Sequence, residues 1–309
     1  MSLETELEAI RTGAAIYPLT DRAFLRITGS DATRWLNGMV TNNIKDLAPG
    51  EGNYNFLLNA QGRIQADCTI YRTPPAEPIE YLLESDTSQI PTIQQLLDHF
   101  IIMDDVELTP ALADEQSILI LGPNARALLE SLALPAIASF NLAHADTPHG
   151  PVLLLSATAN HYELRAATAT ITALTAITNL TPVSHEALEA HRILSAIPKF
   201  GQDIRDRDLP QETAQTHALH FAKGCYLGQE IVERIRSRGQ VHRTFTAFTL
   251  TGQLPELPAA LEANGKPAGE LTSAIQIGDT LHALGYLRRE AATQPLTYPG
   301  GIATPRQAS

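Results

Sequence analysis

The chain contains only two cysteines, Cys68 and Cys225, among its 309 residues. So small a number excludes the disulfide framework of small secreted proteins and a zinc site built from four thiolates. Long apolar runs are also missing, and a segment such as 152–155 is far shorter than the ~20 residues that span a bilayer. Residues 1–11 are acidic and carry no apolar signal core. We therefore expect a cytoplasmic protein with free thiols.

Positive charge is scarce as well. Lys and Arg number 22 against 34 Asp and Glu, which gives a net charge of −12. A nucleic-acid or anionic-membrane binder needs a cationic field, so we expect no direct nucleic-acid partner and no membrane partner. The phosphate-binding patterns G-x-x-x-x-G-K-[ST] and G-x-G-x-x-G are absent, as is the hydrolase pattern G-x-S-x-G. A local basic pocket for a small acidic molecule remains compatible with this composition.

Strand and helix patterns alternate irregularly along the chain, which favours an α+β fold over a doubly wound parallel sheet. Residues 53–58 and 63–71 form a predicted hairpin, and the apolar spacing in other segments predicts helices. We expect residues 1–240 to form the main body, with two intertwined subdomains. Short strands separated by turn residues predict a small antiparallel β-barrel over residues 241–292. Residues 293–309 are rich in Pro, Gly and Thr, and we predict a flexible tail there.

Cys225 lies in the segment of the chain with the most chemically suggestive residues. It falls just before, or in the first turn of, a helix predicted over residues 226–238, where the positive helix end stabilises a thiolate. Lys223 adds a nearby cation, Gly224 permits close backbone approach, and Gln229 and Glu230 can fold back on the loop amides. One hypothesis is a partly exposed thiol of lowered pKa. The alternative is a small buried apolar side chain, the usual fate of a lone cysteine.

Other chemistry-bearing residues give weaker patterns. The basic stretch from Arg234 to Arg243 is either a solvated face with intrahelical ion pairs or a wall for a carboxylate ligand. Period-two alternation places Cys68 on the core face of its strand and Asp67 on the opposite face with Arg63. The histidines show no metal-ligand pattern, so we expect no metal site.

The motif around the cysteine resembles that of a known family. Its letters are K-G-C-Y-x-G-Q-E, formed by Lys223, Gly224, Cys225, Tyr226, Gly228, Gln229 and Glu230. It is similar to the K-G-C-[FY]-x-G-Q-E motif of the YgfZ-type folate-binding proteins, relatives of a mitochondrial iron–sulfur assembly factor. Further similarity lies in residues 25–42, 57–67, 197–212 and 269–289.

The resemblance implies the fold of the glycine cleavage T-protein, a folate-binding α+β body with a central cavity and a C-terminal antiparallel β-barrel. It implies a folate-linked accessory factor that assembles or maintains iron–sulfur clusters, including those of enzymes that modify tRNA. Its partners would be iron–sulfur client enzymes or assembly proteins, and its cofactor tetrahydrofolate or another folate. Cys225 would be the functional thiol, with Lys223 beside it. We expect the folate contacts to come from Asp67, Arg63, Glu212, Arg192 and Arg238.

Two departures separate this sequence from the aminomethyltransferases that share the fold. Their hairpin carries paired acids where this chain has Ala66 and Asp67, and a pterin-binding Glu where this chain has Leu194. Glu186, Glu189 or Glu212 would have to replace that carboxylate. The alternative function is a tetrahydrofolate-dependent aminomethyltransferase, and a third is a folate-binding module with an inert Cys225. For the accessory factor, the thiol could hold a cluster or sulfur species, exchange disulfides or handle a one-carbon adduct.

Overall fold

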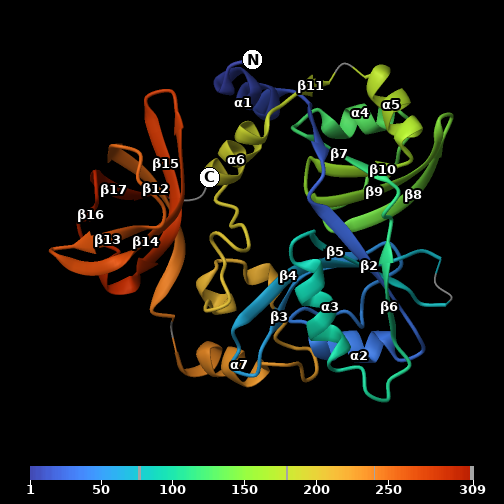
Figure 1. The fold of residues 1–309 in the computed structure, drawn as a ribbon, viewed down its shortest axis with the longest axis horizontal. Helices are drawn as coiled ribbons and strands as arrows, with labels where there is room; N and C mark the ends of the chain where they lie inside the picture. The colour runs from blue at the N-terminus through green and yellow to red at the C-terminus, as the bar shows by residue number, and fades with distance from the viewer. Residues whose placement is uncertain (76–77, 179, 240, 307–309) are drawn as a thin grey trace.

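The computed structural model describes residues 1–75, 78–178, 180–239 and 241–306. Its body contains two sheets, which lie one above the other in Figure 1, with the barrel beside them. The lower sheet is antiparallel, in the order β3-β4-β5-β2-β6. Its strands are β2 (Arg22–Thr28), β3 (Gly52–Leu58), β4 (Ile64–Arg72), β5 (Tyr81–Asp86) and β6 (Glu107–Ala111), and its helices are α2 (Ala32–Met39) and α3 (Ile90–Asp98). The predicted β3–β4 hairpin is confirmed.

The upper sheet is ordered β11-β1-β7-β10-β9-β8, and only its β11–β1 pair is parallel. The strand β1 precedes the lower sheet in sequence but belongs to the upper one, so the two halves of the body are interleaved. The strands are β1 (Ala15–Leu19), β7 (Gln116–Leu121), β8 (Asn141–Thr147), β9 (Gly150–Thr158), β10 (His161–Ala166) and β11 (Thr181–Pro182). The helices are α1 (Leu3–Thr12), α4 (Ala125–Ser131), α5 (Thr168–Ala176) and α6 (His185–Leu194).

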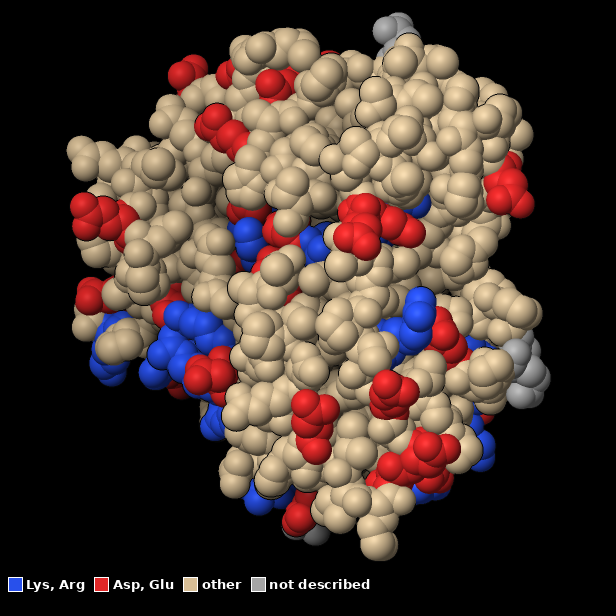
Figure 2. Space-filling view, turned by 45° about the vertical axis from the view of Figure 1, so that its right-hand side comes forward, with Lys and Arg blue, Asp and Glu red and all other residues tan. Residues whose placement is uncertain are grey.

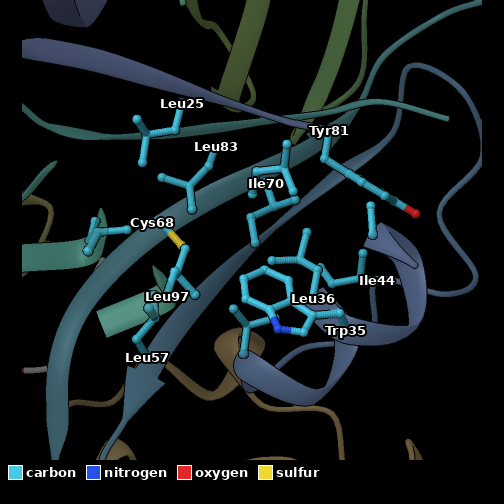
Figure 3. Close-up of a cluster of buried hydrophobic side chains, with 14 of the residues drawn as sticks. Leu25, Trp35, Leu36, Ile44, Leu57, Cys68, Ile70, Tyr81, Leu83 and Leu97 are labelled. Atoms are coloured by element: carbon cyan, nitrogen blue, oxygen red, sulfur yellow. The ribbon is translucent and has the colours of Figure 1, made fainter. Parts of the chain in front are cut away.

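The main hydrophobic core lies between the lower sheet and its two helices. Figure 3 shows Cys68 from β4 in this cluster with Trp35 and Leu36 of α2. The Cys68 side chain is only 2% exposed, as the alternation along its strand predicted. Burial raises the pKa of its thiol well above the ordinary value. Cys68 is therefore a core residue.

The C-terminal region forms a closed antiparallel barrel, ordered β12-β15-β14-β13-β16-β17. Its strands are β12 (Arg243–Gly252), β13 (Ala259–Ala263), β14 (Lys266–Ile277), β15 (Thr280–Arg288), β16 (Leu296–Tyr298) and β17 (Gly301–Arg306). The predicted flexible tail over 293–309 is therefore wrong up to Arg306, because Leu296, Tyr298 and Ala303 are buried in the barrel core. Pro and Gly in this segment supply the turn between two strands. Residues 307–309 lie outside the described part.

The body and the barrel are joined by the segment from α6 to α7 (Gln229–Arg238), which includes the short 3-10 helices at Pro210–Glu212 and Thr216–Ala218. A third 3-10 helix, Arg289–Ala291, follows β15. The predicted α+β body with a C-terminal antiparallel barrel is confirmed. Within the described ranges, none of the helices combines the length and apolar content that crossing a bilayer requires.

Candidate functional site: a thiol loop and a charged cavity

The thiol of Cys225 is exposed, in the loop that leads to α7. The helix begins at Gln229 rather than at the predicted Tyr226, because Gly228 takes a left-handed conformation with φ of 81°. Cys225 therefore precedes the helix and does not lie in its first turn. The exposure of its side chain excludes the alternative of a buried apolar cysteine.

Lys223 anchors this loop to the end of α2. Its Nζ donates hydrogen bonds to the backbone oxygens of Val40, at 2.8 Å, and of Asn42. The same Nζ lies 5.2 Å from the centre of the Tyr226 ring. Burial lowers the pKa of Lys223 to about 7. Through these hydrogen bonds the Lys223 side chain holds the loop in place, a role that the sequence did not predict.

Tyr226, the residue after Cys225, is buried. Tyr226 packs with Phe56, Ile64 and Val232 in a cluster under the loop, and its backbone N–H donates to Oε1 of Gln229 at 3.3 Å. Gln229 thus folds back on the loop as predicted, while the side chain of Glu230 is exposed. With Lys223 and Tyr226 turned inward, the backbone presents Cys225 to the solvent.

The two glycines of the motif behave differently. A Cβ on Gly228 would lie 2.6 Å from the carbonyl oxygen of Asn59 and 3.1 Å from Cα of Gly62, both in the β3–β4 turn. This close approach explains why Gly228 is required. A Cβ on Gly224 would meet nothing within 4 Å, so the close approach that Gly224 permits is not made by the described residues of this chain. The space beside Gly224 is open, next to the exposed thiol.

A cavity of about 330 Å³ lies between the two sheets and α6. Figure 2 shows acidic and basic side chains gathered in a recess across the middle of the molecule. The apolar part of the wall includes Leu119, Leu155 and Phe200. Its acids are Asp21, Asp67, Glu84, Asp86, Glu163 and Glu189, and its basic side chains are Arg22, Lys199, Arg192, His161, His185 and His191. Such a cavity suits a small molecule with several hydrogen-bond donors.

Asp67 is one of the predicted site residues that line this cavity. Its Oδ2 accepts a hydrogen bond from the Tyr54 hydroxyl at 2.6 Å, and its Oδ1 accepts one from Nε2 of Gln89 at 2.8 Å. Burial raises the pKa of this carboxyl above its ordinary value. Tyr54 also packs against the cluster that contains Tyr226, so one side chain contacts both the cavity acid and the base of the thiol loop.

Two further cavity acids are nearly buried. Glu84 pairs with Arg22 at 2.6 Å, and its other oxygen accepts a hydrogen bond from Tyr71 at 3.3 Å. Glu163 accepts a hydrogen bond from the hydroxyl of Ser117. Burial, with the nearby charge of Glu84, raises the pKa of Glu163 to about 7. Neither acid was among the predicted site residues, although a glutamate inside an otherwise apolar strand was a visible signal.

Arg192 reaches the cavity but is already engaged. Its guanidinium pairs with Glu189 at 2.9 Å and with the fully buried Asp203 at 2.6 Å, and it donates to Oγ of Ser273 in the barrel. Leu194, which stands where the aminomethyltransferases have a glutamate, is not among the cavity-lining residues. Of the three candidates for the missing carboxylate, the structure places Glu189 on the cavity wall.

Two further predicted folate contacts, Arg63 and Glu212, do not line the cavity. Arg63 lines a separate hollow beside the barrel, where its guanidinium donates to the backbone oxygen of Arg207. Glu212 is buried and pairs with Arg243 at 3.1 Å. The side chain of Arg238, at the end of α7, lies outside the described part. Glu212 precedes the motif closely in sequence but does not reach the cavity, because the segment before α7 turns toward the barrel.

Comparison with known proteins identifies the class to which this architecture belongs. The sequence profile of the GCVT N-terminal domain matches residues 1–223, and that of the CAF17 C-terminal beta-barrel domain matches residues 243–307. The crystal structure of glycine cleavage system aminomethyltransferase T from Bartonella henselae has the same fold, with a TM-score of 0.84 over 99% of this chain and 88% of that one, at 16% identity. The chain belongs to the GCVT N-terminal domain family and carries the CAF17-type barrel, in agreement with the predicted YgfZ-type resemblance.

Two curated relatives of this chain carry different names. One is an iron–sulfur cluster assembly factor IBA57 homolog, mitochondrial, from Neurospora crassa, 28% identical over 279 residues that cover 84% of this chain. This chain spans 58% of the length of that relative. The other is an aminomethyltransferase from Bacillus velezensis, 25% identical over 291 residues that cover 89% of this chain and 78% of the relative.

Proposed function

We propose that this protein is a folate-linked accessory factor for the assembly or maintenance of iron–sulfur proteins, and that it acts through the thiol of Cys225. The observation that carries the proposal is the construction of the loop. Lys223 and Tyr226 are both held inward by specific contacts, and Cys225 between them is exposed. A thiol that is presented by its own backbone suits transfer to or from a partner protein. The proposed setting is the cytoplasm, and the partners are iron–sulfur client enzymes or assembly proteins.

The cluster or sulfur species is the cargo in this proposal. Clusters generally take about four ligands, and the described residues contain no group of three or more His, Cys, Asp or Glu placed to hold a metal. One thiolate from Cys225 therefore has to be combined with ligands from a partner. This requirement favours brief handling of the cargo over stable storage.

The residues of the cavity fit a folate head group. A pterin presents amide and amino donors, and Asp67, Glu84 and Glu189 supply carboxylate acceptors on the cavity wall. The cavity of about 330 Å³ lies at the lower end of the range for small-molecule sites. A bound tetrahydrofolate would supply one-carbon chemistry. Through Tyr54, which contacts both Asp67 and the cluster under the loop, occupancy of the cavity could affect the position of Cys225.

The thiol part of the proposal is tested by reactivation of a cluster-depleted iron–sulfur enzyme by the purified protein. Cys225→Ser should abolish the effect, whereas Cys68→Ala should retain it because Cys68 is a core residue. Undiminished reactivation by Cys225→Ser would contradict the proposal. Titration with tetrahydrofolate by calorimetry, for the native protein and for Asp67→Asn, tests the cofactor part separately, and no binding to the native protein would remove the folate.

The second candidate is a tetrahydrofolate-dependent aminomethyltransferase, which the position of Asp67 on the cavity wall favours. Against it, the second acid of the transferase pair is replaced by Ala66, which is fully buried. A transferase does not need the thiol. Tetrahydrofolate-dependent aminomethyl transfer that survives in Cys225→Ser would therefore support this candidate over the first.

A further inference from the structure

A groove runs along the junction of the body and the barrel, away from the central cavity. Two open hollows, of about 840 Å³ and about 730 Å³, share Arg243 and Arg288 in their walls. Neither hollow shares a lining residue with the central cavity. The charged residues of the groove are Arg63, Arg207, Arg243, Arg288 and Arg289 against Glu212, Glu270 and Glu290. Figure 2 shows basic side chains gathered on this side of the molecule, toward the barrel.

Part of this charge has a structural role. Arg205 and Arg243 are both about one-fifth exposed, and each pairs with Glu270 of β14. Arg243 also pairs with the buried Asp208 at 2.6 Å and lies over the Tyr286 ring. These pairs attach the barrel to the body. Arg243, which lines both hollows, is therefore part of the attachment of the barrel.

Attachment of the barrel does not explain the exposed arginines at the rim of the groove, Arg63, Arg207 and Arg288. Arg207 is 58% exposed and shares Glu270 with Arg205 and Arg243, so one carboxylate serves three guanidinium groups. Arg288 is 51% exposed, and its ion pair with Glu290 is long, at 3.7 Å. Arg63, also exposed, is brought to Arg207 by its hydrogen bond to that backbone. The exposed rim of the groove, formed by Arg63, Arg207 and Arg288, therefore carries more guanidinium groups than carboxylates that pair with them.

The barrel register adds a second, independent observation. Arg243 of β12 and Arg288 of β15 are directly opposite each other in the antiparallel pair. Like charges at such positions are destabilising. The arrangement brings two guanidinium groups to the end of the ladder that lies between the two hollows. Arg243 already pairs with Asp208, Glu212 and Glu270, so Arg288 is the guanidinium of this pair that a bound carboxylate would reach.

We propose that this groove is a docking site for an acidic segment of a partner protein. Guanidinium forks bind carboxylates bidentately, and the exposed Pro258 and Pro267 in the wall are suited to the apolar part of a peptide. A nucleic acid is disfavoured because the chain as a whole carries a net charge of −12, which repels a long polyanion beyond the groove. The site is independent of Cys225 and of the folate cavity.

The test uses a fluorescein-labelled octaglutamate peptide and fluorescence anisotropy at low salt. The double variant Arg207→Gln/Arg288→Gln removes two rim charges and leaves Arg205 and Arg243 on Glu270. The matched control, Arg11→Gln/Arg126→Gln, removes the same charge from two exposed arginines that pair within helices elsewhere. We expect the rim variant to bind the peptide about tenfold more weakly and the control to bind as the native protein does.

Four outcomes would overturn the proposal. The first is that the native protein does not bind the peptide, and the second is equal weakening in both double variants, which would reflect net charge alone. The third is tighter binding of a single-stranded RNA octamer than of the peptide. The fourth is displacement of the peptide by tetrahydrofolate, which would show that the two ligands do not bind at independent sites. Selective weakening in the rim variant, without competition from tetrahydrofolate or RNA, supports it.

Discussion

Gly228 lies so close to Asn59 that a Cβ on the glycine would come within 2.6 Å of the asparagine carbonyl oxygen. The contact joins the thiol motif to the turn of the β3–β4 hairpin, far away in the sequence. It also fixes the point at which α7 begins, because Gly228 is the left-handed residue before the first helical turn. The loop of Cys225 is therefore shaped by a neighbour that the motif does not contain.

Gly228→Ala should destabilise the protein. A non-glycine residue in the left-handed conformation costs about 1–3 kcal/mol, and the clash with Asn59 adds to this cost. Urea unfolding measures the loss. Gly224→Ala is the matched control within the same motif, since its methyl group meets nothing within 4 Å, and it should change stability by less than about 0.5 kcal/mol. Equal effects of the two substitutions would contradict the account of the loop.

The two cysteines should differ sharply toward a thiol reagent. In the native protein, iodoacetamide should modify Cys225, which is exposed, and spare Cys68, which is 2% exposed and has a pKa raised by burial. Mass spectrometry of the digested protein locates the label. Cys225→Ser should remove the labelling of the native protein, and unfolding in urea should restore labelling at Cys68. If Cys68 in the native protein were modified as fast as Cys225, it would not be buried in the core of the lower sheet.

Lys223 should make stability depend on pH above neutrality. Its pKa is about 7 in the folded protein and about 10.4 in an unfolded chain. Between these values the unfolded chain holds more protons, so the contribution of Lys223 to the free energy of unfolding rises with pH. The difference in stability between the native protein and Lys223→Met should therefore shift in favour of the native protein from pH 6 to pH 9. If the difference in stability stayed constant over this range, the pKa of Lys223 would not be lowered by burial.

The contribution of Glu163 to the free energy of unfolding should fall with rising pH, opposite to that of Lys223, and at lower pH values. Burial raises its pKa from 4.5 to about 7, so the folded protein holds more protons than the unfolded chain between these values. Its contribution to the free energy of unfolding falls as pH rises through this window. Glu163→Gln removes the titration, and its amide can still accept the hydrogen bond from Ser117. Relative to this variant, the native protein should lose stability between pH 5 and pH 8, measured by urea unfolding; a gain would contradict the assignment.

Local patterns were sufficient for much of the fold and for the motif. Period-two alternation predicted the buried face of β4 with Cys68, and short strands separated by turn residues predicted the C-terminal barrel. The motif letters predicted that Gln229 folds back on its loop. The strands β16 and β17 were missed because each is short and half-buried, and because their prolines and glycines resemble a linker. Their pairing partners are distant in sequence.

The residues of the candidate site also divide into those that the sequence indicated and those that only the structure brought together. The sequence by itself singled out Cys225 through its motif, and Asp67 through the resemblance of its hairpin to that of a known family. Only the tertiary structure brought Glu84, Glu163 and Arg22 to one cavity and turned Arg63 and Glu212 toward the barrel. The reason is physical: residue type and spacing fix which face of an element is buried, whereas long-range packing decides which faces meet and therefore which charges share one low-dielectric space.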